Sequence, residues 1–291
     1  MLATRPSPVQ DRRGDGAQNN VLETGLQNVQ MTEWLVVVPA RLASTRLPAK
    51  PLADLAGKPL IARVVENLAP LAREGAAIVA AVDDERTAEA CRQHGINFEM
   101  TSPDLPTGTD RCAEVASRAK WADRDFILNV QGDEPFIEPA DLVTLCARFS
   151  SATKTSGAHM PPAPRMASLY FRSHDPQRFV APSTVKVVLD RYHHAIYFSR
   201  SPIPHNRDNA GKATSLFLVH MGVYAFQKAC LGEFCRLPHG QLEQTEKLEQ
   251  LRAVEAGWRI LMCEAAKESL GIDTPEDLER ARQKIAGSKS R

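Results

Sequence analysis

Three cations lie close together near the start of the chain, in a segment without acidic residues. Arg41, Arg46 and Lys50 come directly after a run of apolar residues. Pro48 and Pro51 oppose a helix at this point, so we expect an extended loop. Such a loop can close around a polyphosphate, because guanidinium forks and an ammonium neutralise phosphate oxygens. On charge alone, the same residues also fit an ordinary basic surface loop.

Two aspartates are candidates for binding a magnesium ion. Asp133 lies in the segment NVQGDEP, directly after an apolar run, and Asp273 lies in the segment GIDTP. Mg²⁺ in proteins typically takes one or two carboxylates together with phosphate oxygens. Gln131 offers both a donor and an acceptor, which suits a base edge or a sugar hydroxyl. The alternatives are a tight turn around Asp133 and a helix start at Asp273.

Strands alternate with helices along most of the chain, and this order sets where the candidate residues lie. Apolar β-branched runs predict strands, and amphipathic stretches bounded by caps predict helices. We expect strands at 34–38, 76–82, 96–100, 126–130 and 260–263, and helices at 59–68, 85–94, 109–120, 139–149, 242–256 and from 275. The alternation predicts an α/β fold with a mainly parallel sheet and helices on both faces. Such sheets bind ligands at the carboxyl ends of strands, where the basic loop and Asp133 are expected.

The chain is expected to divide into an N-terminal extension and one domain. Residues 1–30 are polar and aperiodic and contain no aromatic residue, so we expect them to be disordered. Residues 31–291 fit a single α/β domain. Within it, about residues 180–226 predict a β-rich excursion from the main sheet that forms a subunit interface. Its expected elements are a hairpin of 185–189 with 194–198 and a strand at 216–226, preceded by an exposed insertion at 151–164.

Composition and motif content exclude several classes of protein. The chain has 291 residues, with 36 Lys+Arg against 35 Asp+Glu and 6% aromatic residues. This charge balance gives no long-range attraction to nucleic acid or anionic lipid, and so few aromatics make no stacking platform. Neither GxxxxGK[ST] nor GxGxxG occurs, which argues against a P-loop enzyme and a nicotinamide oxidoreductase. Six cysteines without a CxxC, and no long apolar stretch, favour a soluble intracellular protein with reduced thiols.

Several short motifs occur in order across residues 33–282, namely VPARLASTRLPAKPL, GTDR, NVQGDEPFI, VKVVLD, YFSRSPIP, LEQLR and GIDTPEDLERAR. Together they resemble the 3-deoxy-manno-octulosonate (Kdo) cytidylyltransferases, also called CMP-Kdo synthetases. The resemblance implies a Rossmann-like fold of the nucleotide-diphospho-sugar transferase type. It implies transfer of CMP from CTP to Kdo, with release of pyrophosphate and with Mg²⁺ as cofactor. It also implies a homodimer in the cytoplasm of a Gram-negative bacterium that serves lipopolysaccharide biosynthesis, without a nucleic-acid partner or membrane insertion.

The same resemblance implies roles for individual residues. The side chains expected to bind the nucleotide are Arg41, Ser44, Arg46, Lys50 and Arg111. Those expected to line the Kdo pocket are Gln131, Arg200, His220, Tyr224, Glu249 and Gln250. Lys50, Arg46 and Asp133 are the expected catalytic residues, and Asp133 and Asp273 the expected ligands of Mg²⁺.

Two departures from the family pattern leave alternatives open. Ala49 stands where the family usually has Gly, which would strain the phosphate loop if this position requires a positive φ. His205 and Asn206 replace a usual aromatic–acid pair in the β-rich part. One alternative is therefore the same reaction with a related acid sugar, such as 8-amino-Kdo or a nonulosonic acid. A catalytically silent nucleotide-binding homologue is the other, although intact Lys50, Asp133 and Asp273 argue against it.

Overall fold

The apolar run after Glu33 forms the central strand β1 (Trp34–Ala40), in which every residue is buried. A continuous Val-rich run is typical of a strand that is covered on both faces in a parallel sheet. β1 pairs in parallel with strands on both of its sides. It therefore lies inside the sheet, and its carboxyl end delivers the basic loop to one edge.

The computed structural model describes most of the domain that the sequence predicts. Its described residues are 30–154, 162–208 and 216–289. The expected disordered extension at 1–30 falls outside them apart from its last residue, so its disorder stays a prediction. Part of the expected insertion at 151–164 also falls outside. Residues 151–154 continue a helix instead of forming a loop, and the hydroxyls of Ser150 and Thr153 donate to carbonyls of that helix.

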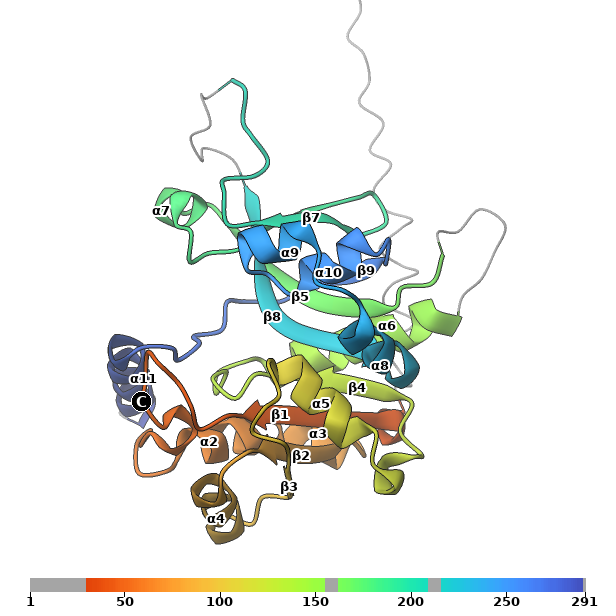
Figure 1. The fold of residues 1–291 in the computed structure, drawn as a ribbon. Helices are drawn as coiled ribbons and strands as arrows, with labels where there is room; N and C mark the ends of the chain where they lie inside the picture. The colour runs from red at the N-terminus through yellow and green to blue at the C-terminus, as the bar shows by residue number, and fades with distance from the viewer. Residues whose placement is uncertain (1–29, 155–161, 209–215, 290–291) are drawn as a thin grey trace, which may run out of the picture.

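Nine strands of the described chain form one sheet (Figure 1). Its strands are β1, β2 (Ala77–Val82), β3 (Phe98–Met100), β4 (Phe126–Asn129), β5 (Met166–Ser173), β6 (Lys186–Leu189), β7 (Ala195–Ser199), β8 (Phe217–Gln227) and β9 (Ile260–Glu264). The order along the sheet is β3-β2-β1-β4-β8-β5-β9. Along this path, pairing is antiparallel only where β8 meets β4 and β5, so every strand on the path except β8 runs in one direction. The predicted α/β fold with a mainly parallel sheet is confirmed.

The β-rich part is more closely joined to the sheet than expected. The predicted hairpin is present, because β6 and β7 pair in antiparallel fashion. The long strand β8, however, lies in the main sheet between β4 and β5, and β6 pairs with its outer half. Only the hairpin therefore lies off the main path. β8 belongs to the sheet because its apolar, alternately buried residues fill the gap between the two parallel groups of strands.

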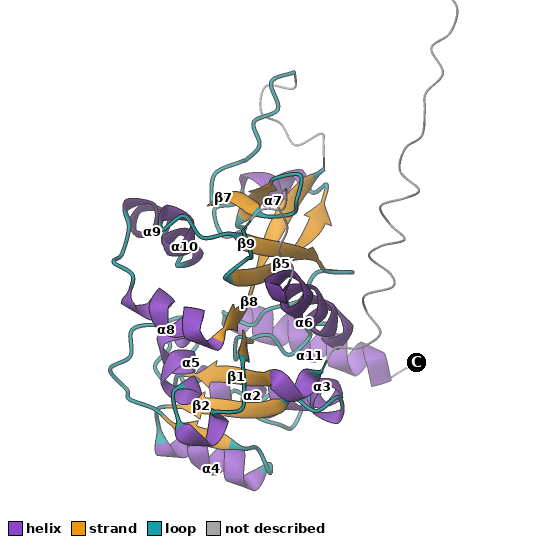
Figure 2. Cartoon of the chain, turned by 90° about the vertical axis from the view of Figure 1, so that its right-hand side faces the viewer, coloured by secondary structure: helices purple, strands orange, loops and turns teal. Residues whose placement is uncertain are grey.

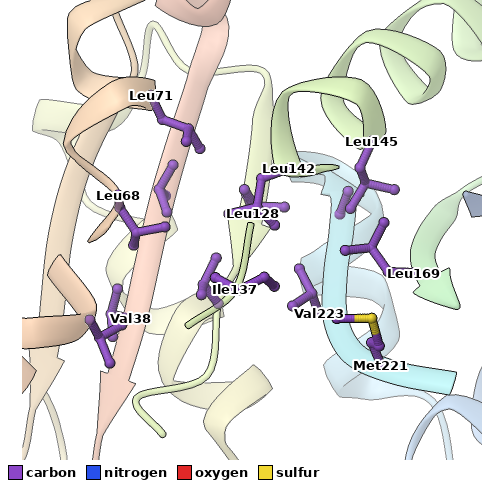
Figure 3. Packing of buried hydrophobic residues seen from close by; sticks show 14 of the residues in the cluster. Val38, Leu68, Leu71, Leu128, Ile137, Leu142, Leu145, Leu169, Met221 and Val223 are labelled. Atoms are coloured by element: carbon purple, nitrogen blue, oxygen red, sulfur yellow. The ribbon is translucent and has the colours of Figure 1, made fainter. Parts of the chain in front are cut away.

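Helices cover both faces of the sheet, as Figure 2 shows. They are α2 (Leu60–Asn67), α3 (Ala69–Arg73), α4 (Glu85–Gln93), α5 (Gly108–Ala116), α6 (Pro139–Lys154), α7 (Pro176–Val180), α8 (Lys228–Arg236), α9 (Gln241–Glu246), α10 (Gln250–Glu255) and α11 (Pro275–Lys289). Alternate residues of β1 point to opposite faces. Val36 and Val38 pack with α2, α3 and α6, partly shown in Figure 3, and Leu35 and Val37 pack with α5 and α8. Two apolar layers thus hold the strand ends in place.

Two helices differ from the sequence prediction. The helix expected at 109–120 begins at Gly108, because the Thr107 hydroxyl accepts from the backbone N–H of Asp110 and caps it. The helix expected at 242–256 is broken into α9 and α10. Lys247 adopts a left-handed conformation at the break, with φ of 54°. The break turns the chain so that the residues after Lys247 face the sheet.

Candidate active site

A polar cleft opens at the carboxyl ends of β1 and β4. Its lining residues come from the basic loop, the start of α5 and the turn after β4: Pro39, Ala40, Arg41, Ala43, Ser44, Thr45, Arg46, Lys50, Pro51, Pro106, Thr107, Gly108, Arg111, Gln131, Gly132 and Asp133. The expected phosphate-binding residues therefore share one cleft with Asp133. This is the edge of the sheet at which open α/β folds bind ligands.

The basic loop ends in a strained turn that aims Lys50 into the cleft. Ala49 has φ of 51° and ψ of 38°, which is a left-handed conformation. The position therefore does require a positive φ, the condition under which Ala in place of the usual Gly strains the loop. Its carbonyl accepts a hydrogen bond from the N–H of Leu52 at 2.8 Å, which closes a short 3-10 turn over Lys50–Leu52. An L-residue in this conformation costs about 1–2 kcal/mol. The surrounding structure therefore holds the turn against its local preference.

Lys50 joins the two candidate metal ligands. Its Nζ lies 2.6 Å from Asp133 Oδ2 and 2.9 Å from Asp273 Oδ1. Burial alone would lower the pKa of Lys50, but the two carboxylates outweigh it and raise that pKa above its ordinary value. Arg46 adds a second cation at 3.1 Å from Asp273 Oδ2. The fold thus brings together residues that lie far apart in the sequence.

Asp273 reaches this cleft because the chain before α11 is tied to the turn after β4. The N–H of Ile272 donates to the carbonyl of Asp133 at 2.9 Å. A capping box then starts α11: Asp277 Oδ2 accepts from the N–H of Thr274, and Thr274 Oγ1 accepts from the N–H of Asp277. Further along α11, Arg282 donates to the carbonyl of Asp54 at 2.8 Å. The predicted cap therefore leaves Asp273 free to face Asp133.

Gly132 lets the turn after β4 approach β1. A Cβ atom built on it would lie 2.6 Å from the carbonyl oxygen of Pro39, closer than non-bonded atoms come. The backbone on both sides would have to move to accept a side chain. Gly132 therefore fixes the distance between the basic loop and Asp133.

The other residues expected to bind the nucleotide differ in their exposure and in the partners they already have. Arg41 and Ser44 line the cleft, and each makes a local bond, Arg41 to the carbonyl of Ala43 and Ser44 Oγ from the N–H of Leu47. Arg111 also lines the cleft, yet it is only 1% exposed and is paired with Asp83 at 3.1 Å. Burial lowers the pKa of Arg111. Arg111 is thus held in the wall of the cleft by its ion pair, whereas the side chain of Arg41 lies at the surface.

A second cleft lies on the other side of β8. Its lining residues come from β5, α7, β8, α10 and the segment before α11: Glu134, Phe171, Arg178, Ser183, Thr184, Val185, Val219, His220, Met221, Gly222, Tyr224, Leu248, Gln250, Glu268 and Ser269. It holds three of the residues expected around an acid sugar, namely His220, Tyr224 and Gln250. The rings of His220 and Tyr224 lie 5.7 Å apart between centroids, so both side chains lie on one face of β8.

Glu249 and Gln131 are linked through a network of hydrogen bonds that involves α5. The Thr109 hydroxyl donates to Glu249 Oε1 at 2.7 Å and accepts from Asn129 Nδ2 at 3.3 Å. Asn129 Oδ1 in turn accepts from Gln131 Nε2 at 3.1 Å. Burial raises the pKa of the Glu249 carboxyl. Thr109 thus connects two expected substrate-binding residues.

Comparison with known proteins places this arrangement among enzymes that use cytidine nucleotides. A family model described as Cytidylyltransferase matches residues 35–262. A 3-deoxy-manno-octulosonate cytidylyltransferase of Geobacter sulfurreducens is 45% identical over 257 residues, which is 86% of this chain and 98% of the relative. One from Anaeromyxobacter is 46% identical over 256 residues, which is 88% of this chain and 98% of the relative. The chain belongs to the 3-deoxy-manno-octulosonate cytidylyltransferase family.

A solved structure agrees with this family and with the fold. It is that of a CMP:2-keto-3-deoxy-manno-octonic acid synthetase complexed with CTP. The match has a TM-score of 0.77 and 38% sequence identity, and it covers 88% of this chain and 99% of the other. The likeness therefore spans both clefts of this cytidylyltransferase rather than one motif.

Three residues expected around the acid sugar, Gln131, Glu249 and Arg200, do not line the second cleft, and Arg200 lines neither cleft. The Arg200 guanidinium donates to the carbonyls of Pro182 and Glu246, and its backbone N–H donates to Glu246 Oε2. Arg200 is not among the residues that line the second cleft. It braces β7 against the break between α9 and α10, because Glu246 is the last residue of α9.

The structure also adds charged residues that sequence reasoning missed. Arg178 lines the second cleft, where it pairs with Glu268 at 2.6 Å. Glu134 lines the same cleft, and its Oε2 is buried without a hydrogen-bond partner among the described residues. Burial and the nearby Asp133 carboxylate raise the pKa of Glu134 to about 7. Its place beside Asp133 in the NVQGDEP motif was the only available signal for Glu134, and Arg178 lies in no motif.

The donor set of this family member suits a magnesium ion that is completed by substrate oxygens. Within the described ranges, no group of three or more His, Cys, Asp or Glu side chains is placed to hold a metal. Asp133 and Asp273 nevertheless aim one oxygen each at a common cation, the Lys50 ammonium. Two carboxylates together with phosphate oxygens form the usual protein site for Mg²⁺. Asp133 and Asp273 therefore fit this metal.

Proposed function

We propose that this chain transfers CMP from CTP to Kdo, giving CMP-Kdo and pyrophosphate, with Mg²⁺ as cofactor. The observation that carries the proposal is the meeting of Lys50 with Asp133 and Asp273 at the carboxyl edge of the sheet. Relatives at 45% and 46% identity that carry the name of this activity support it. A catalytically silent homologue would have no need of this charged arrangement.

The basic loop would hold the triphosphate. Arg41, Ser44, Arg46 and Lys50 line the first cleft on one side. During transfer, negative charge grows on the α-phosphate and on the leaving pyrophosphate. Cations that are already in place stabilise this charge without having to reorganise. Lys50 and Arg46 are best placed for it, because ion pairs with Asp133 and Asp273 hold their side chains beside the proposed metal site.

Asp133 and Asp273 would hold the metal between the nucleotide and the acid sugar. When bound there, Mg²⁺ would offset phosphate charge and lower the pKa of the attacking sugar hydroxyl. Gln131 lies beside Asp133 and would orient the acid sugar through its amide. His220, Tyr224 and Gln250 would bind the rest of the sugar in the second cleft. The main task of the chain is to place the hydroxyl in line with the leaving group.

Among the residues that the structure describes, no histidine is placed to act as a general base in this scheme. His220 is the histidine in the second cleft, and burial lowers its pKa to about 3. Both of its ring nitrogens already have partners, Ser168 Oγ at 2.9 Å and Gln250 Nε2 at 3.4 Å. His220 would therefore contribute shape and orientation rather than proton transfer.

Pyrophosphate release from the purified protein tests the proposal. The reaction contains CTP, Kdo and Mg²⁺, and the controls omit Kdo, omit CTP or add EDTA. Release that requires all three components supports the proposal. If CTP binds in calorimetry but no pyrophosphate appears, the same assay with 8-amino-Kdo and nonulosonic acids tests the related acceptors. Failure with every acid refutes the proposed transfer and leaves a nucleotide-binding protein.

We further propose that the enzyme is a homodimer that acts in the bacterial cytoplasm, where its nucleotide substrate is made. Most of the large apolar side chains exposed on the described residues lie in the β-rich part: Val180, Tyr192, Ile196 and Leu216. Apolar side chains gathered on a surface are typical of a protein interface. Along the described part of the chain, no helix is both long and apolar enough to cross a membrane. Sedimentation of the wild type and of Ile196→Lys tests the dimer, and a wild type that stays monomeric at all concentrations refutes it.

A further inference from the structure

Ser168 lies beneath the second cleft and contacts several groups at once. It is on β5 and is fully buried. Its Oγ lies 2.7 Å from the carbonyl oxygen of Val223, 3.1 Å from that of Met221 and 2.9 Å from Nε2 of His220. A serine hydroxyl has a single proton, so it can donate to only one of these three atoms.

The carbonyl oxygens decide where this proton goes. The pairing of β5 with β8 shifts here from Ser168↔Tyr224 to Leu169↔Met221, so the residues between Met221 and Tyr224 have no partner in the register of β5. The Ser168 hydroxyl lies at this irregularity and reaches the carbonyl of Val223 at the shortest of its three distances. A carbonyl oxygen only accepts, whereas a ring nitrogen can donate. The hydroxyl therefore donates to Val223 and accepts from His220.

The tautomer of His220 then determines the orientation of the Gln250 amide and the acceptor of the Tyr224 hydroxyl. If Nε2 of His220 carries the proton, Nδ1 of the neutral ring is an acceptor. Nδ1 faces Gln250 Nε2 at 3.4 Å, so the amide group of Gln250 turns its NH₂ towards His220. Gln250 Oε1 is then the acceptor for the hydroxyl of Tyr224, which lies 3.1 Å away. In this series of hydrogen bonds, each group donates to the next one, from the hydroxyl of Tyr224 to the carbonyl of Val223.

We propose that Ser168 is a positioning residue that holds His220 in its Nε2–H form and thereby keeps an N–H of Gln250 directed at the second cleft. This inference rests on the proposed function, since the ligand of that cleft is the acid sugar. The NH₂ group of Gln250 has two protons, and His220 takes one of them. We infer that the second faces the cleft, because Gln250 is among the residues that line it. A donor at this place suits the carboxylate and hydroxyl oxygens of an acid sugar.

Removing the Ser168 hydroxyl would reverse the direction of the hydrogen bond between His220 and Gln250. In Ser168→Ala, Nε2–H of His220 has no acceptor, so the Nδ1–H form of the ring becomes the better one. Nδ1–H then needs an acceptor, and Gln250 can supply it only by turning its Oε1 towards His220. The cleft would lose an ordered donor, and a carbonyl-type oxygen near a carboxylate ligand is unfavourable.

Steady-state kinetics separate this role from a general loss of structure. For Ser168→Ala we expect the KM for Kdo to rise at least ~10-fold, because a hydrogen bond to a charged group is lost. The KM for CTP should change less than ~2-fold, since the first cleft is untouched. Ser168→Thr keeps the hydroxyl and should restore most of the affinity for Kdo. Ser173→Ala is the matched control, because Ser173 is another buried serine of β5 whose Oγ accepts only from the nearby N–H of Asp175.

Nitrogen NMR of the histidine rings tests the proton positions without any substrate. Comparison with His220→Gln assigns the His220 signals. We expect Nε2–H in the wild type and in Ser168→Thr, and Nδ1–H in Ser168→Ala. An Nδ1–H or charged ring in the wild type overturns the inference, as does a Ser168→Ala variant with unchanged tautomer or unchanged KM for Kdo. If no acid sugar reacts at all, the proposed function fails, and the NMR result still decides the role of Ser168 in holding His220.

Discussion

Replacing Ala49 by Gly should stabilise the protein, although it removes a methyl group. Ala49 has φ of 51°, and the left-handed conformation costs an L-residue about 1–2 kcal/mol. Gly avoids this cost but gives the unfolded chain more freedom, which opposes folding by about 0.4–1 kcal/mol. We therefore expect the free energy of unfolding to rise by about 0.5–1 kcal/mol, the difference between these two effects. For a domain of this size, Tm should rise by about 1–4 °C.

Urea unfolding and a thermal scan of Ala49→Gly measure this gain. Ala56→Gly is the matched control, because Ala56 has φ of 55° and lines neither cleft. Both variants should gain stability by a similar amount. The affinity for CTP should change less than ~2-fold in Ala49→Gly, since the Leu52–Ala49 hydrogen bond and the Lys50 ion pairs already hold the loop. A gain in Ala56→Gly without one in Ala49→Gly would refute the strain argument for the phosphate loop.

Three further perturbations test the geometry of the site. Asp133→Asn should keep the fold and lower turnover at least ~100-fold, since a direct ligand of the metal is lost; normal turnover with Mg²⁺ would contradict the metal assignment. Gly132→Ala should lower turnover because its Cβ would lie 2.6 Å from the carbonyl oxygen of Pro39, whereas Gly287→Ala, with open space around its Cβ, should leave turnover unchanged. His220 has its pKa lowered to about 3 from 6.5, so below pH 6.5 the unfolded chain binds a proton that the native state refuses. The free energy of unfolding should thus fall by about 2 kcal/mol between pH 6.5 and pH 5, and by less in His220→Gln, as followed by urea titration at each pH.

The parts of the site that follow strands could be predicted from the sequence. The apolar run that ends at Asn129 predicts a buried strand. Because the carboxyl ends of parallel strands meet at one edge of a sheet, this strand places Asp133 beside the basic loop. Thr274 and its capping box could also be predicted, because capping depends on residue types a few positions apart. These two signals are local. The strain at Ala49 was instead predicted from the resemblance, because the family usually has Gly at this position.

The parts that depend on distant contacts could not be predicted. A Lys has no preference for the left-handed conformation, so nothing in the sequence marks Lys247 as the end of α9. The break is held by Glu246, which accepts from Ser199 Oγ at 2.6 Å and from the N–H of Arg200 at 2.9 Å. The same contacts hold Arg200 away from the lining of the second cleft, whereas the resemblance implied that it lines the Kdo pocket. Thr109, the first residue of the helix expected at 109–120, donates to Glu249 across the fold.

The position of Asp273 has a consequence for the newly made chain. The basic loop and Asp133 are synthesised well before the segment that carries Asp273, which comes just before the final helix α11. A ribosome-bound chain can therefore fold most of its sheet while the proposed metal site still lacks one carboxylate. Until the segment that carries Asp273 has been made, Lys50 would pair with Asp133 alone, and we expect such a chain to be inactive. Activity would thus begin only after this segment has been synthesised and has folded.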